Sequence, residues 1–239
     1  MIFDIWKAHK VVTGLIESFI EMLEMDRDMF LRVMDVLSGT IQRVDVQAEV
    51  YRRDVEINRR ERAIRRAIVE YLTANPGGDL PACLVLMSVV KDAERVGDYS
   101  KNLLEVAQVL DKPMEDLRYR QEISEIAEHV KGIFDDTIRA YRNSDAETAR
   151  EVVSDEAAMT KRCDALIEQV ARSDLNANEA VCTAMLMRFL KRIEAHLSNI
   201  SSSLVLPVHR IDGRLDYKSK KKGSNQADQA PSDSEVSES

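Results

Sequence analysis

Apolar residues recur every three or four positions along most of this chain, which is the spacing of one face of an α-helix. Near the start, the pattern runs through Val12, Leu15, Ile16, Phe19 and Met22. Helices of this kind bury the apolar face and leave the opposite, charged face in water. The chain is therefore predicted to fold as a set of amphipathic helices.

Residues typical of turns interrupt this pattern at five places, each rich in Gly, Pro, Asn, Asp or Ser. The five interruptions predict six helices. Their expected extents are 4–37, 44–74, 80–110, 115–142, 145–172 and 178–205. At the start of the fifth helix, Ser144 and Glu147 have the spacing of a capping box, in which each side chain bonds the backbone of the other residue.

The third and sixth helices have related sequences, which indicates an internal duplication. Residues 93–103 align with residues 190–200 without gaps, and Arg95 matches Arg192. Three amphipathic helices can close a core of their own. The sequence therefore predicts an all-α protein of two tandem antiparallel three-helix bundles.

The expected boundaries follow from the same turns. The first bundle is predicted over residues 1–112 and the second over residues 113–217. Residues 218–239 contain one apolar side chain larger than alanine, Val236, among many serines. A segment with so little to bury does not offset the entropy lost on folding, so a disordered C-terminal tail is expected.

Composition narrows the class of protein further. The 239 residues include only 8 Gly and 5 Pro, which excludes sandwiches, barrels, collagen and most βαβ folds. A formal net charge of −8 makes nucleic acid an unexpected partner. The three cysteines form no CxxC pair, and the uncharged apolar run Leu80–Val90 is far shorter than the roughly 20 residues of a membrane helix. A cytoplasmic protein is expected.

Four polar side chains are candidates for a metal site. Glu94 and Asp98 are four residues apart on one predicted helix, and Asp54 and Asn58 are four apart on the preceding one. The two pairs lie at nearly equal distances from the turn at 75–79, so an antiparallel hairpin brings them to matching heights. Hard oxygen ligands of this kind suit magnesium, manganese, calcium or iron. The alternative is a solvated helix face held by ion pairs.

The helical phase also predicts where this site lies. Asp54 falls beside the apolar stripe of its helix, whereas Glu94 and Asp98 fall on the polar side of theirs. A site made from both is expected on the flank of the bundle, open to water. The di-iron centres of ferritin-like bundles differ from this, because they are closed and use Glu-x-x-His motifs, which this chain lacks.

Three linked motifs resemble the PhoU family of phosphate-uptake regulators. The segment KDAERVGDYSKNLLEVA resembles the signature helix of the family, which has the form LERIGDxAxNIA. The stretch DVEINRRERAIRRAIVEYLTANPGGDLPA resembles the preceding helix and turn, and AYRNSDAETAREVVSDEAAM resembles the start of the second repeat. The resemblance covers roughly residues 15–205.

The resemblance implies a function as well as a fold. Proteins of the PhoU family are pairs of three-helix bundles, often dimeric, and act in the cytoplasm as negative regulators. They are thought to link a phosphate-specific ABC transporter to a membrane sensor histidine kinase. Metal clusters lie on their surface, so the resemblance implies that Asp54, Asn58, Glu94 and Asp98 hold a divalent or ferric ion. The sequence does not distinguish iron, magnesium, manganese and zinc.

The second repeat departs from the family pattern. Lys191 and Ala195 stand where the family has acidic residues, and the partner helix offers Asp155 but then Met159. A carboxylate beside an ammonium group forms an ion pair rather than a metal cage. Metal binding is therefore expected in the first bundle only. His196 with Glu194 is a less favoured replacement set of ligands.

The prediction is a regulatory adaptor of phosphate transport and phosphate-starvation signalling that is not an enzyme. Its expected partners are a phosphate transporter, of the ABC class or another, a sensor histidine kinase and a second copy of itself. Contact with a membrane is expected only peripherally, through Lys218 and the lysines at 220–222. The alternatives are a metal-dependent helical enzyme and a structural helical oligomer without regulatory activity.

Overall fold

The computed structural model of this chain describes residues 10–110, 112 and 114–211. Within these residues the chain forms six α-helices and one short 3-10 helix, and no strand. The helices are α1 (Lys10–Leu37), α2 (Arg43–Ala74), α3 (Leu80–Val109), α4 (Leu117–Asn143), α5 (Ala146–Ala171) and α6 (Ala177–Ser202), and the 3-10 helix is η2 (Val208–Arg210). The all-α prediction is confirmed. The predicted helical residues 4–9 and the predicted tail, 218–239, lie outside the described residues.

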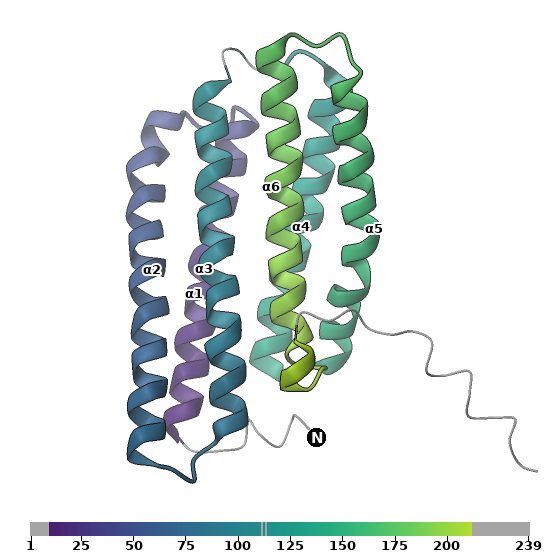
Figure 1. Ribbon diagram of the computed structural model, residues 1–239. Coiled ribbons are helices and arrows are strands. Elements are labelled where there is room, and N and C mark those ends of the chain that lie inside the picture. The colour runs from purple at the N-terminus through teal and green to yellow at the C-terminus, as the bar shows by residue number, and fades with distance from the viewer. Residues whose placement is uncertain (1–9, 111, 113, 212–239) are drawn as a thin grey trace, which may run out of the picture.

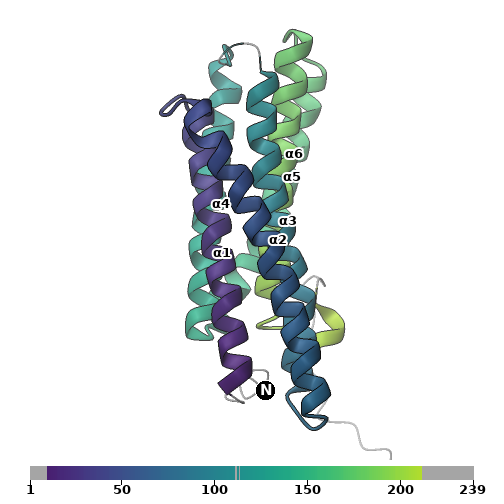
Figure 2. The ribbon, with the colours of Figure 1, turned by 90° about the vertical axis from the view of Figure 1, so that its left-hand side faces the viewer.

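The six helices alternate in direction and lie side by side (Figure 1). α1, α2 and α3 form one half of the molecule, and α4, α5 and α6 form the other. Viewed from the α2 side, α1 and α4 lie toward one side and α3 and α6 toward the other (Figure 2). The halves meet where α3 packs against α6 and α1 packs against α4, while α2 and α5 lie at the two outer ends.

Corresponding residues of the two halves meet at this contact. The rings of Phe30 and Phe134 lie 5.4 Å apart between α1 and α4. The rings of Tyr99 and His196, which occupy aligned positions in the repeats, stack 5.6 Å apart between α3 and α6. The two halves are therefore related by an approximate twofold axis that passes through these pairs.

The apolar residues picked out by the helical spacing form one continuous core. It runs through both halves, so the bundles do not have separate interiors. Its largest fully buried side chains are Tyr119, Phe19, Phe30, Phe134, Met22, Leu23, Met29, Ile57, Ile68, Leu86, Leu103 and Leu104.

One local prediction is wrong. α5 is capped by Asp145, whose carboxylate accepts from the backbone N–H groups of Glu147 and Thr148 at 3.0 and 3.2 Å. Ser144 instead ends α4 in the left-handed conformation, with φ of 52°. Because Ser144 makes that tight turn, the cap passes to the next residue, and Thr148 completes it with a hydroxyl bond of 2.7 Å to Asp145.

Close packing between α1 and α3 depends on a glycine. A Cβ atom at Gly97 of α3 would lie 2.8 Å from Oδ1 of Asp26 in α1 and 3.2 Å from Cδ1 of Ile57 in α2. Asp26 is fully buried, with an exposed fraction of 0%. Gly97 thus allows a carboxylate into the contact between three helices.

Gly97→Ala is expected to destabilise the protein by about 1–3 kcal/mol, because the added methyl group overpacks this contact. Urea denaturation of the wild type and the variant measures the loss. Gly132→Ala in α4 is the matched control, since nothing lies within 4 Å of a Cβ there. That control should raise stability by about 0.4–1 kcal/mol. Equal effects of the two substitutions would contradict the packing argument.

Candidate functional site

The hairpin of α2 and α3 brings two of the predicted site residues to one cation. The ammonium nitrogen of Lys101 lies 2.9 Å from Oδ1 of Asp54 and 3.2 Å from Oδ1 of Asp98. All three side chains are partly buried, with exposed fractions of 20% for Lys101, 13% for Asp54 and 27% for Asp98. Lys101 therefore ties α2 to α3 through a shared ion pair.

The other two predicted residues have different partners. Glu94 accepts a 2.6 Å bond from Lys91 and lies 3.8 Å from Arg95. The side-chain amide of Asn58 donates to the backbone oxygen of Asp54 at 3.0 Å, which leaves its own oxygen facing away from that bond. Among the described residues, no three acidic, histidine or cysteine side chains are grouped closely enough to surround a metal ion directly.

Glu94 lies deeper than the helical phase predicts. Only 7% of this residue is exposed, so the expectation of an open, solvated flank is wrong at this position. The reason is the close packing of α3 against the other helices of the first half. Glu94 lies near the buried Asp26 of α1, and Gly97, three residues further along α3, lets Asp26 and Ile57 of α2 approach closely.

Asp26 is the residue that sequence reasoning missed. Neither of its carboxylate oxygens has a hydrogen-bond partner among the described residues. Burial raises its pKa well above the usual value, and the charges of Glu94, Asp54 and Asp98 raise it further. A signal exists in the sequence, because Asp26 falls in the register of the buried residues Phe19, Met22, Leu23, Met29, Phe30 and Val33.

The surroundings of Asp26 are rich in acidic side chains. Asp26, Asp54, Glu94 and Asp98 bring four carboxylates to the contact between α1, α2 and α3, and the chain supplies Lys91, Arg95 and Lys101 against them. Lys91 and Arg95 are about half exposed and reach only Glu94 and Asp98. Asp26 has no cationic partner among the described residues, so its raised pKa favours the protonated, neutral form unless a cation binds beside it.

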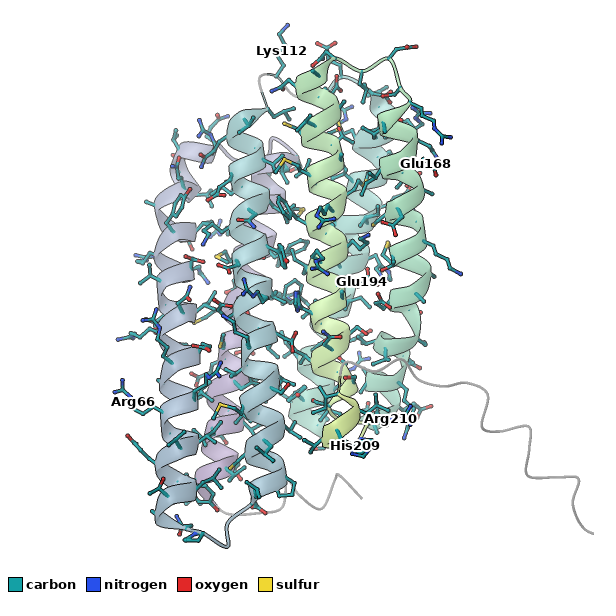
Figure 3. The ribbon with its side chains drawn as sticks, viewed as in Figure 1. Arg66, Lys112, Glu168, Glu194, His209 and Arg210 are labelled. Atoms are coloured by element: carbon teal, nitrogen blue, oxygen red, sulfur yellow. The ribbon has the colours of Figure 1, made fainter. Side chains whose placement is uncertain are left out.

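The second half is built differently at the corresponding place. Lys191, which replaces the first acid of the motif, forms an ion pair with Asp164 rather than with Asp155. Glu194 occupies the position that Gly97 has in the first repeat and is almost fully buried. Figure 3 shows it near the middle of α6. His129 of α4 lies 3.3 Å from its Oε1 atom.

His196 does not join Glu194, so the replacement ligand set considered for the second repeat does not form. Nδ1 of His196 lies 2.7 Å from Oδ1 of Asp92 in α3. Asn199 donates to the same oxygen at 3.4 Å. These bonds link the two halves beside the stacked pair of Tyr99 and His196.

The comparisons with known proteins bear on both halves. The sequence matches the PhoU domain twice, over residues 19–107 and 123–204. The chain belongs to the PhoU family. Each PhoU domain falls within one half of the fold, so the duplication seen in α3 and α6 extends over three helices. Among proteins with curated descriptions, no sequence matches this chain significantly.

Two solved structures share the PhoU fold. The phosphate transport system regulatory protein PhoU from Streptococcus pneumoniae is 16% identical, with a TM-score of 0.72 over 81% of this chain and 93% of that one. PhoU from Pseudomonas aeruginosa is 19% identical, with a TM-score of 0.74 over 82% of this chain and 95% of that one. At these identities the likeness establishes the fold.

The second PhoU repeat holds a pair of groups that titrate together. The bond to Glu194 raises the pKa of His129, and the charge of Asp155 adds to this, while burial and Arg162 oppose it. Burial raises the pKa of Glu194, against the effect of His129. Both shifts are upward, so the folded protein holds more protons than the unfolded chain between the ordinary Glu and His values.

Stability is therefore expected to fall as pH rises from 6 to 8. The contribution of His129 is fully present below its unfolded pKa of about 6.5 and is lost as pH rises through the higher folded value. His129→Gln should flatten this slope, by about 1 kcal/mol across the window. Urea denaturation at pH 6 and pH 8 measures it, with the exposed His209→Gln as control. A slope unchanged in His129→Gln would contradict the assignment.

Proposed function

We propose that this protein is a regulatory adaptor of phosphate transport and phosphate-starvation signalling. It acts through contacts with a phosphate transporter and with a sensor histidine kinase, so that ample phosphate silences the starvation response. The observation that carries the proposal is the pair of PhoU domains at 19–107 and 123–204. The fold shared with the S. pneumoniae phosphate transport system regulatory protein supports it.

The adaptor works by binding rather than by catalysis. Nucleophilic catalysis by cysteine requires an accessible thiolate. All three cysteines of the chain, Cys83, Cys163 and Cys182, are buried and form no disulfide. Burial raises the pKa of Cys163 to about 12 and also raises that of Cys83, which keeps both thiols protonated at neutral pH.

The site of action is the cytoplasmic side of the membrane, where the transporter and kinase expose their inner faces. None of the described helices is long and apolar enough to span a bilayer. Buried cysteines that form no disulfide are typical of a reducing compartment. The adaptor is proposed to act as a homodimer, on the strength of the family resemblance.

A metal site in the first bundle accompanies this role, made by Asp54, Asn58, Glu94 and Asp98. The buried carboxyl group of Asp26 beside them, which has no hydrogen-bond partner among the described residues, supports it. A divalent or ferric ion held by these residues would supply positive charge next to Asp26, which Lys101 does not contact.

Removal of the protein from its host cell is expected to switch on phosphate-starvation genes even in ample phosphate. A starvation reporter measures this, and the intact gene should restore repression. Under scarce phosphate the reporter should be equally active in both strains, which is the internal control. Reporter activity that is the same with and without the gene at both phosphate levels would rule out the regulatory role. Metal-dependent turnover, with no transporter recovered by affinity capture, would favour an enzyme instead.

The double variant Glu94→Ala, Asp98→Ala is expected to lose metal that the wild type retains, because it removes two of the four proposed ligands. Elemental analysis after gentle purification measures the metal content per chain. Asp155→Ala in the second repeat is the matched control, since it removes an exposed acid near the degenerate motif. Equal metal content in the double variant and the wild type would contradict the assignment of Glu94 and Asp98 as metal ligands.

A further inference from the structure

The strongest unexplained feature of the site is the position of Lys101. Among the described residues, only its ammonium group contacts an acid of the site on each helix, Asp54 on α2 and Asp98 on α3. These two contacts hold the ammonium group in place between α2 and α3.

A metal ion bound by the same two carboxylate oxygens would overlap this ammonium group. Metal–oxygen bonds are about 2.0–2.6 Å long. Lys101 Nζ lies 2.9 and 3.2 Å from the two Oδ1 atoms, within the space that a bridging ion would fill. Both cations therefore compete for one place.

We propose that Lys101 is a tethered cation that competes with metal ions for Asp54 and Asp98. Metal enters only by displacing this side chain, and the strength of metal binding is set by the cost of that displacement. The inference rests on the metal site proposed above. It adds a residue that opposes the metal, at a position of the signature helix that supplies no ligand.

Asp26 explains why a metal ion can win this competition. The ammonium group contacts Asp54 and Asp98, whose two charges its single charge only half balances, and no hydrogen-bond partner is found for either oxygen of Asp26 among the described residues. Lys101 carries a single charge on an arm anchored in α3. An ion of charge two or three is free of that anchor, and it attracts all the carboxylates of the cluster more strongly.

Removal of the ammonium group is expected to strengthen metal binding. Lys101→Met keeps the aliphatic stem and should bind Mn²⁺ about tenfold more tightly or better than the wild type. The full-length proteins are stripped with chelator, dialysed and titrated with Mn²⁺, and free Mn²⁺ is followed by electron paramagnetic resonance. In chelator, Lys101→Met should melt at a lower temperature than the wild type and gain more from Mn²⁺.

Lys131→Met is the matched control for net charge. Lys131 lies on α4 in an exposed ion pair with Glu128, so its loss should leave Mn²⁺ binding unchanged. Lys101→Gln should reproduce the gain of Lys101→Met, and Lys101→Arg, which keeps the charge, should not. Adding Asp98→Asn to Lys101→Met should abolish the gain.

Equal or weaker Mn²⁺ binding in both Lys101→Met and Lys101→Gln, relative to the wild type, would overturn the inference. A gain of the same size in Lys131→Met would also overturn it, because it would reflect net charge alone. The function proposed above fails separately. Tight Mn²⁺ binding by Lys101→Met, with no metal in the wild type from cells, would support Lys101 as competitor and remove the metal from the regulatory role.

Discussion

The packing of α3 against α6 is the constraint on which the rest of this structure depends. Because α3 also contacts α1 and α2, nearly every side of it is covered. Polar groups of α3 that a lone three-helix bundle would leave in water are enclosed, including Asp92, which lies 2.7 Å from His196 of α6. Charges removed from water need partners. On another side of the same helix, Lys101 and Asp98 meet Asp54 of α2 in the half-buried network of the candidate site.

Much of the fold could be predicted from the sequence because helical spacing and turn residues are local signals. The limits of α2 and α3 differ from expectation by about one residue, well within the usual uncertainty of helix ends. The placement of Asp54 and Asp98 opposite each other also followed from counting outward from one turn. The contact of both residues with Lys101 could not be predicted in this way. The direction of a long, flexible side chain depends on its neighbours in space, which helical spacing does not specify.

The features that sequence reasoning missed depend on close packing between helices. Glu94 is buried on the part of α3 that lies near Asp26 of α1. Asp26 was overlooked because charged residues are rarely buried, even at positions in the register of the apolar face. Gly97, which has no side chain, leaves the space in which the carboxyl group of Asp26 is buried. The capping prediction failed for a similar reason. Ser144 was needed to end one helix, so Asp145 became available to start the next.

Both halves bury a carboxylate at the same level, but from different helices. Asp26 lies four residues before Phe30 in α1, and the residue four before Phe134 in α4 is the fully buried Val130. On the helices that face α1 and α4 the acid is in the other repeat. α3 of the first repeat has Gly97, and α6 of the second has Glu194 at the corresponding position. The acid has therefore changed sides of the contact, and a histidine now lies beside it.

The approximate twofold axis has a consequence for how such a chain can diverge. At most positions the repeats are free to drift apart, because each residue has its own neighbours. At the axis, however, Tyr99 meets His196 and Phe30 meets Phe134, so each residue is the environment of its own counterpart. The pair of Tyr99 and His196 shows that the two repeats already differ at this contact. A protein made of two copies of the first repeat would place one tyrosine against another at this contact. Neither repeat can therefore replace the other without changing the contact at the axis.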